Sequence, residues 1–192
     1  MLSCLVSPIL RHRFGMMIGL LGTWCLIARH WLIGEERGRT AFADAIGHVT
    51  AICVQKRVQE LVTHLVEMYT TKDDDVSRCT VAYTLLQVAI RASDSLKKCF
   101  KDVIPVAFLG RSDPIDEAQK SFERLWEEIG IGQPERLYTQ EIVRCISSGF
   151  VSSSWNIKKQ SAASVSLLAD SISLHLRPVR FVGRMRCAHQ CL

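Results

Sequence analysis

The sequence predicts an all-α fold in which helix pairs stack into an α-solenoid. Apolar residues recur with a helical period from Thr40 to Leu176, and no convincing run alternates with the two-residue period of a strand. A short sequence pattern also returns at intervals of about 40 residues, which is typical of helical repeat arrays. The chain has 192 residues, of which 48% are apolar and 22% charged, so it can bury enough surface to fold.

Residues 1–38 form a divergent apolar and basic segment. Arg11 and Arg13 precede the apolar run 14–28 (FGMMIGLLGTWCLIA), which has the length of a signal-peptide core or short signal anchor. A spanning helix needs about 20 residues, and no clean small-x-small cleavage site follows the run. Membrane anchoring through residues 14–28 therefore stays open as an alternative to a buried helix.

The body of the chain, residues 39–176, is predicted to contain successive amphipathic helices. Apolar stripes lie within residues 42–53, 54–66, 79–90, 115–129, 138–146 and 162–176. Residues 72–75, 111–114 and 130–134 are expected turns, and Pro178 stops the last helix. A short helix capped by Ser93 or Asp94 should end near Lys101, because Pro105 is expected to kink or break a helix within the apolar run 101–110.

Two polar clusters are interpreted as helix caps. Asp73, Asp74 and Asp75 stand just before an apolar stripe, where carboxylates favour the positive end of a helix, so capping is preferred over metal binding. The serines 152–154 precede Trp155 in the same way. Phosphorylation of these serines is the weaker alternative.

The repeated pattern consists of a basic residue, three small or apolar residues, and Ala. It occurs at 39–43 (RTAFA), at 78–82 (RCTVA) and, with Gln as the second residue, at 159–163 (KQSAA). The first step is about 40 residues and the second about twice that, so one register near Lys120 is filled by a divergent unit. This period is that of a HEAT-type, armadillo-like array of about four repeats. In such an array Ala lets helices approach, and the cation reaches the rim or caps a carbonyl end.

The net charge of +5 resides at the two ends of the chain. Residues 1–38 carry +2 and residues 175–192 carry +4 from four arginines without an acid, so the body, 39–174, carries −1. A nucleic-acid interface needs a basic stripe along the fold, and this body offers none. The basic tail 177–192 is expected to be poorly ordered and no nucleic-acid partner is predicted.

The cysteines predict neither disulfides nor a metal centre. Six of the eight are widely separated in the sequence with no C-x-x-C, a pattern of reduced, apolar fillers; they are Cys4, Cys25, Cys53, Cys79, Cys99 and Cys145. Cys187, His189 and Cys191 offer three soft ligands, but a closed zinc site needs a fourth. No cofactor is predicted.

No arrangement of residues predicts catalysis. His48 and His64 lie on helical stretches without a nucleophile at a defined spacing. Glu127 and Glu128 are adjacent on a helix, so their side chains diverge. The Gly130-Ile131-Gly132 run lacks a preceding strand and has Glu135 in place of a third glycine. The chain is therefore expected not to be an enzyme, and no catalytic, metal or specific binding residue is identified.

Several blocks in the body resemble a known family. They are residues 39–49 (RTAFADAIGHV), 101–110 (KDVIPVAFLG), 125–129 (LWEEI), 136–146 (RLYTQEIVRCI) and 152–171 (SSSWNIKKQSAASVSLLADS). In order and spacing they are similar to the giant HEAT-repeat proteasome adaptor and scaffold family, the Ecm-type proteins. The block around Trp155 is the most specific, and residues 1–38 and 177–192 do not follow the pattern.

The resemblance implies a non-catalytic scaffold that binds proteasomes. It implies partners in the proteasome core and regulatory particles, which such proteins tether, and a cytoplasmic location with possible nuclear and endomembrane association. A HEAT-type transport adaptor, similar to importins, would share the fold and differ in cargo. An array of so few repeats is also expected to expose an apolar face at each end.

Overall fold

The computed structural model describes residues 36–176, and all regular secondary structure in that range is helical. The helices are α3 (Glu36–Ile52), α4 (Gln55–Thr71), α5 (Asp75–Arg91), α6 (Ser93–Lys97), α7 (Phe100–Gly110), α8 (Asp116–Glu128), α9 (Pro134–Leu137), α10 (Thr139–Phe150) and α11 (Trp155–Leu176). The prediction of an all-α fold is thus confirmed for the described residues.

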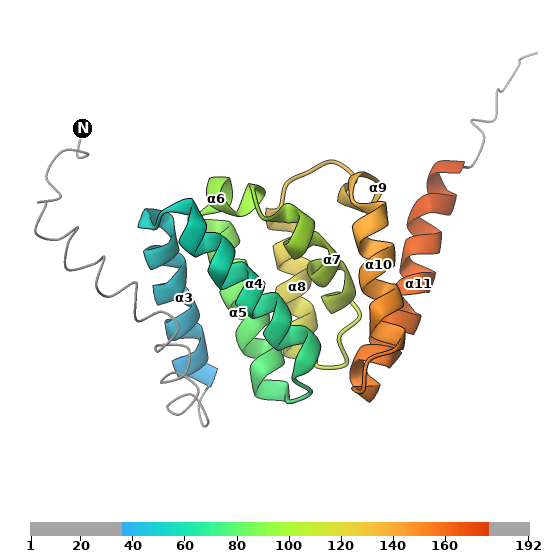
Figure 1. Ribbon diagram of the computed structural model, residues 1–192, viewed down its shortest axis with the longest axis horizontal. Helices are drawn as coiled ribbons and strands as arrows, with labels where there is room; N and C mark the ends of the chain where they lie inside the picture. Colours follow the sequence, from blue (N-terminus) through green and yellow to red (C-terminus); the bar gives the residue numbers. More distant parts are fainter. Residues whose placement is uncertain (1–35, 177–192) are drawn as a thin grey trace, which may run out of the picture.

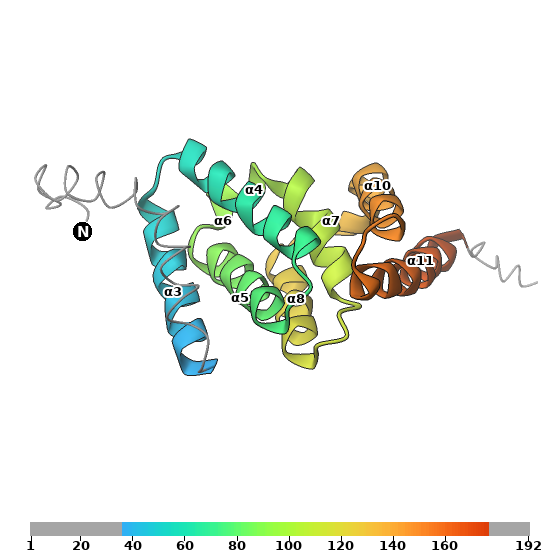
Figure 2. The same ribbon diagram turned by 60° about the horizontal axis from the view of Figure 1, so that its bottom comes forward.

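The longer helices lie in two rows (Figures 1 and 2). In one row α5 lies between α3 and α8, and in the other α7 lies between α4 and α10. Across the rows α4 packs on α5, α7 on α8 and α10 on α11, while the short α6 and α9 stand in the connections. The described residues therefore contain three helix pairs preceded by α3, against the prediction of about four repeats; any partner of α3 before residue 36 lies outside them.

The pairs recur at the predicted interval. The second helices of the three pairs begin at Asp75, Asp116 and Trp155, so successive starts are about 40 residues apart. The cations of the repeated pattern, Arg39, Arg78 and Lys159, lie in α3, α5 and α11, and Lys120 of the divergent register lies in α8. These four basic residues therefore lie on α3 and on the second helix of each of the three pairs.

Local sequence signals explain where α5 begins and α8 ends. The Asp74 carboxylate accepts a hydrogen bond from the Ser77 backbone N–H at 2.8 Å, as the predicted cap requires. After α8, Gly130 adopts φ 63°, a left-handed conformation that glycine takes without strain, and Pro134 opens α9.

Of the predicted kink or break at Pro105, the break was wrong, because α7 runs through this residue from Phe100 to Gly110. Proline removes one N–H donor and so one backbone hydrogen bond. Every residue from 103 to 110 is buried, since α4, α8, α10 and α11 all contact this helix. Burial of so many apolar side chains, at roughly 25 cal/mol per Å², offsets the missing bond.

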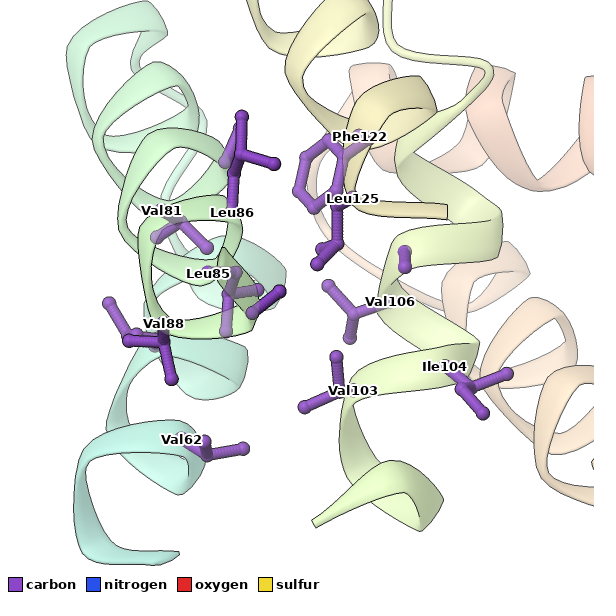
Figure 3. Packing of buried hydrophobic residues seen from close by; sticks show 14 of the residues in the cluster. Val62, Val81, Leu85, Leu86, Val88, Val103, Ile104, Val106, Phe122 and Leu125 are labelled. Atoms are coloured by element: carbon purple, nitrogen blue, oxygen red, sulfur yellow. The ribbon is translucent and has the colours of Figure 1, made fainter. Parts of the chain in front are cut away.

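The core lies between the two rows, and Figure 3 shows its centre. Leu85 and Leu86 of α5 face Phe122 and Leu125 of α8 and the valines of α7. All of these side chains are buried, and most of the apolar residues predicted for α4, α5 and α8 belong to one continuous core. Val54 and Ile90 of the predicted stripes are instead exposed.

Candidate functional site

A buried polar network joins the first helix pair to the next two. It consists of Tyr69 from α4, Arg78 from α5, Asp113 from the α7–α8 loop and Gln160 from α11, all buried. Nη2 of Arg78 lies 2.8 Å from Oδ2 of Asp113, and the guanidinium also stands over the Tyr69 ring, 4.8 Å from its centroid. Residues separated by up to 91 positions thus meet in one cluster.

The Tyr69 hydroxyl is the centre of this network. It donates to Oδ2 of Asp113 at 2.6 Å, and it accepts from Nη2 of Arg78 at 3.3 Å and from Nε2 of Gln160 at 2.9 Å. One donor and two acceptor positions are all that a phenol has, so the hydroxyl is fully used. Burial and the nearby Asp113 charge raise the pKa of Tyr69 well above its ordinary value. The phenol therefore stays protonated and keeps donating to Asp113.

The position of Arg78 corrects one prediction. As the basic residue of the repeated pattern it was expected at a rim or at a carbonyl end, yet its side chain is 0% exposed and pairs with an equally buried carboxylate. The signal in the sequence was its place one turn before Val81 and Ala82, which marks the buried face of α5. A cation on that face requires a buried acid, and Asp113 supplies it.

A second polar cluster joins the three helices of one row. Glu117 of α8 accepts hydrogen bonds from the Tyr83 hydroxyl at 2.6 Å and from Nη2 of Arg39 at 3.4 Å. The Tyr83 hydrogen bond, with the Arg39 charge, lowers the pKa of Glu117. Burial and the Glu117 charge raise the pKa of the adjacent Cys79 thiol to about 12, so it is not a thiolate nucleophile at neutral pH.

The residues considered for catalysis stand apart from these clusters. His48 is exposed and lies 3.6 Å from Asp44 one turn earlier on α3, and His64 is exposed on α4. Glu127 and Glu128 are exposed near the end of α8, and Gly130 and Gly132 belong to the turn after it. The structure does not bring any of these residues together with a second candidate group.

The cap candidates take structural roles. Asp73 accepts a hydrogen bond from Nδ2 of Asn156 at 2.9 Å, while Asp74 caps α5. Ser154 accepts from the Ile157 N–H at 3.2 Å at the start of α11, as predicted for the serines 152–154. Within residues 36–176 no group of three metal-ligating side chains gathers.

Most of the apolar face predicted for the last helix lies on its exposed side. Of the predicted residues, Leu168 is buried as expected, but Ala162, Val165, Ala169 and Ile172 are exposed. The buried side of the helix consists of Leu168 with Ile157, Gln160, Ser161 and Ser164. On the buried side, Nε2 of Gln160 donates to the Tyr69 hydroxyl, and Oγ of Ser161 donates to the Ile157 carbonyl at 2.8 Å, whereas the buried Ser164 hydroxyl has no hydrogen-bond partner within the described residues. The apolar side of α11 is left at the surface.

Two predictions fall on residues that the structure does not describe. They are the apolar run 14–28 with its preceding Arg11 and Arg13, and the tail with Cys187, His189 and Cys191. None of the helices within residues 36–176 combines the length and apolar character needed to cross a membrane.

Comparison with known proteins gives one relative of described role. The chain is 28% identical over 144 residues to the human proteasome adapter and scaffold protein ECM29, a match that covers 71% of this chain and 8% of that protein. No family model and no solved structure matches the sequence. The chain is thus distantly similar to a proteasome adaptor and scaffold protein, and it corresponds to a small part of that protein's length.

Proposed function

We propose that this chain is a non-catalytic, protein-binding scaffold segment that associates with proteasomes. The similarity to the human proteasome adaptor carries this proposal, because it extends over 71% of the chain. The proposal includes an α-solenoid of HEAT-like helix pairs, supported by second helices that begin about 40 residues apart. The resemblance also implies the cytoplasm and nucleus as its location, which imaging of a tagged chain would test.

The buried clusters suit a scaffold better than a catalyst. In a repeat array each pair contacts mainly its neighbours, so relative positions depend on what joins the pairs. Here the Tyr69 network joins all three pairs, and the Glu117 cluster joins α3, α5 and α8. Such ties hold the outward helix faces in a fixed arrangement, and a preorganised surface loses less entropy when it binds a partner.

The size of the segment limits what it can bridge. Packed helices lie about 8–10 Å apart, so three pairs extend over roughly 30 Å. We therefore propose that the described segment contacts one proteasome surface, on the core or on the regulatory particle. Tethering of both particles is the wider role that the resemblance implies.

Immobilised full chain tests the proposal directly. It would be incubated with purified core particle, regulatory particle or assembled proteasome, and retained proteasome would be measured by peptidase activity and by subunit staining. We expect retention of at least one particle at physiological salt. Retention no greater than on an unrelated helical repeat protein of similar charge would contradict a proteasome-binding role.

A further inference from the structure

Helix α11 exposes its apolar side along its length. Trp155, Ala162, Val165, Ala169 and Ile172 share one helical face and are all exposed; we call this set the α11 outer face. Trp155 is 73% and Val165 is 46% exposed, values unusual for large apolar side chains on a helix whose polar side is buried. An apolar face of this kind marks a contact surface.

The start of this face is rigid. Ser154 caps the helix through the Ile157 N–H, and Ser152 accepts from the Ser154 N–H at 3.2 Å. Asn156 is tied to Asp73 on the α4–α5 turn. Phe150 at the end of α10 and Val151 directly after it are also exposed. The face is therefore held in place before any contact forms.

Charges at the two ends of the face are opposite in sign. Lys158 and Lys159 lie three and four residues after Trp155, next to it on the helix, and neither side chain forms a hydrogen bond or ion pair within the described residues. Asp170 is exposed at the other end. The rise of a helix separates Lys159 from Asp170 by about 16 Å along the axis.

This arrangement is complementary to itself when reversed. If a second α11 lies antiparallel, Lys159 of each copy faces Asp170 of the other, and the midpoint between them falls between Ser164 and Val165. Ala162, Ser166 and Ala169 around that midpoint are small enough for two helices to approach closely. A two-fold axis next to Val165 thus joins apolar surface to apolar surface and forms two Lys159–Asp170 pairs.

We propose that the α11 outer face forms an antiparallel, two-fold symmetric contact between two copies of this chain. The contact carries two Lys159–Asp170 ion pairs and a central Val165–Val165 packing. The basic tail 177–192 suits this face less well, because its four arginines would meet Lys158 and Lys159 without an acid to offer. The contact does not depend on proteasome binding.

Sedimentation velocity of the full chain over micromolar to millimolar concentration tests the contact. We expect a shift from the 21.6 kDa monomer toward twice that mass. Val165→Asp places two carboxylates next to the axis and should weaken the dimer by at least about a hundredfold. The control is Val54→Asp, because Val54 is 68% exposed in the α3–α4 turn, and α3 and α11 lie at opposite ends of the array (Figure 1).

Charge exchange makes the test specific to this geometry. Lys159→Asp or Asp170→Lys alone places like charges opposite each other and should weaken self-association at least about tenfold. Mixing the two single variants should restore a dimer. In that heterodimer one chain carries Asp at both positions and the other carries Lys at both, so each of the two pairs again joins opposite charges. The chain that carries both exchanges should also dimerise.

Each remaining result would overturn the proposal. A dimer that Val165→Asp leaves intact uses another surface, and a doubly exchanged chain that stays monomeric excludes the antiparallel register. A monomeric chain whose melting temperature falls on Val165→Asp would have the face covered by its own residues 1–35 or 177–192. If the chain is monomeric and Val165→Asp does not lower its melting temperature, neither a second copy nor the chain itself covers the face, and its partner is a different protein.

Discussion

Replacing Asp113 by alanine tests the network that joins the helix pairs. The substitution removes the carboxylate that pairs with Arg78 at 2.8 Å, accepts from Tyr69 at 2.6 Å and accepts from the Ile115 N–H at 2.9 Å. Arg78 would remain 0% exposed and charged, with Asp73 no closer than 4.0 Å. Removing one partner of such a pair costs about 3–5 kcal/mol, because the other charge stays buried without compensation.

The converse change should cost less. Arg78→Met leaves the Asp113 carboxylate with hydrogen bonds from Tyr69 and Ile115, so we expect about 3 kcal/mol, against about 4–5 kcal/mol for Asp113→Ala. The double variant leaves no buried charge and should be less destabilised than the sum of the two singles. The order of the losses in unfolding free energy therefore depends on which buried charge, that of Arg78 or that of Asp113, remains without its partner.

Urea denaturation followed by circular dichroism measures these differences. For a domain of this size each kcal/mol corresponds to about 2–4 °C in melting temperature, so Asp113→Ala should melt roughly 8–20 °C below the wild type. Thr63→Ala on the exposed side of α4 provides the control. If Asp113→Ala costs less than about 1 kcal/mol, or if the two single effects simply add, the network does not hold the pairs together as described.

Three further predictions follow from individual contacts. Gly110→Ala places a Cβ within the space of the buried Phe122 ring, so we expect a loss of about 1–3 kcal/mol in unfolding free energy. Folding lowers the pKa of Glu117, so its ionised carboxylate contributes fully to stability above the pKa of the unfolded chain, and this contribution is lost as the pH falls through the pKa of the folded chain. The unfolding free energies of the wild type and Glu117→Gln should therefore converge at low pH. In Tyr83→Phe, NMR should show the Glu117 carboxyl titrating at higher pH. Cys79, with a pKa of about 12, should react with a thiol reagent at pH 8 only as fast as the protein opens, and a rate equal to that of a small thiol would refute its burial.

The fold could be predicted where each helix follows its own sequence pattern. The stripes Val58, Leu61, Val62 and Leu65 are buried as their spacing predicts, and Asp74 caps α5. These features depend on residues within a few positions of one another, so the sequence contains all the information they need.

The features that could not be predicted depend on contacts between distant residues. Nothing near Arg78 indicates that a carboxylate 35 positions later would meet it in the core. On α11, Gln160 and Ser161 are buried because Tyr69 and a close approach to Gly149 receive them, which reverses the face that hydrophobicity favours. The helix through Pro105 likewise depends on burial by four other helices.

The exposure of the α11 outer face, which we propose as a contact surface, was not predicted because the spacing of its residues is that of a buried stripe. Ala162, Val165 and Ala169 have the spacing of a buried stripe. In a repeat array such a stripe is normally covered by a neighbouring helix, and only the structure shows which stripes are covered and which are exposed.

Association with proteasomes is the central claim, and a binding isotherm tests it most directly. Labelled full chain would be titrated with purified assembled proteasome at physiological salt, with fluorescence anisotropy as the readout. The account predicts saturable binding that excess unlabelled chain displaces. An anisotropy that stays at the value of the free chain across micromolar proteasome, with the chain shown to be folded, would contradict it.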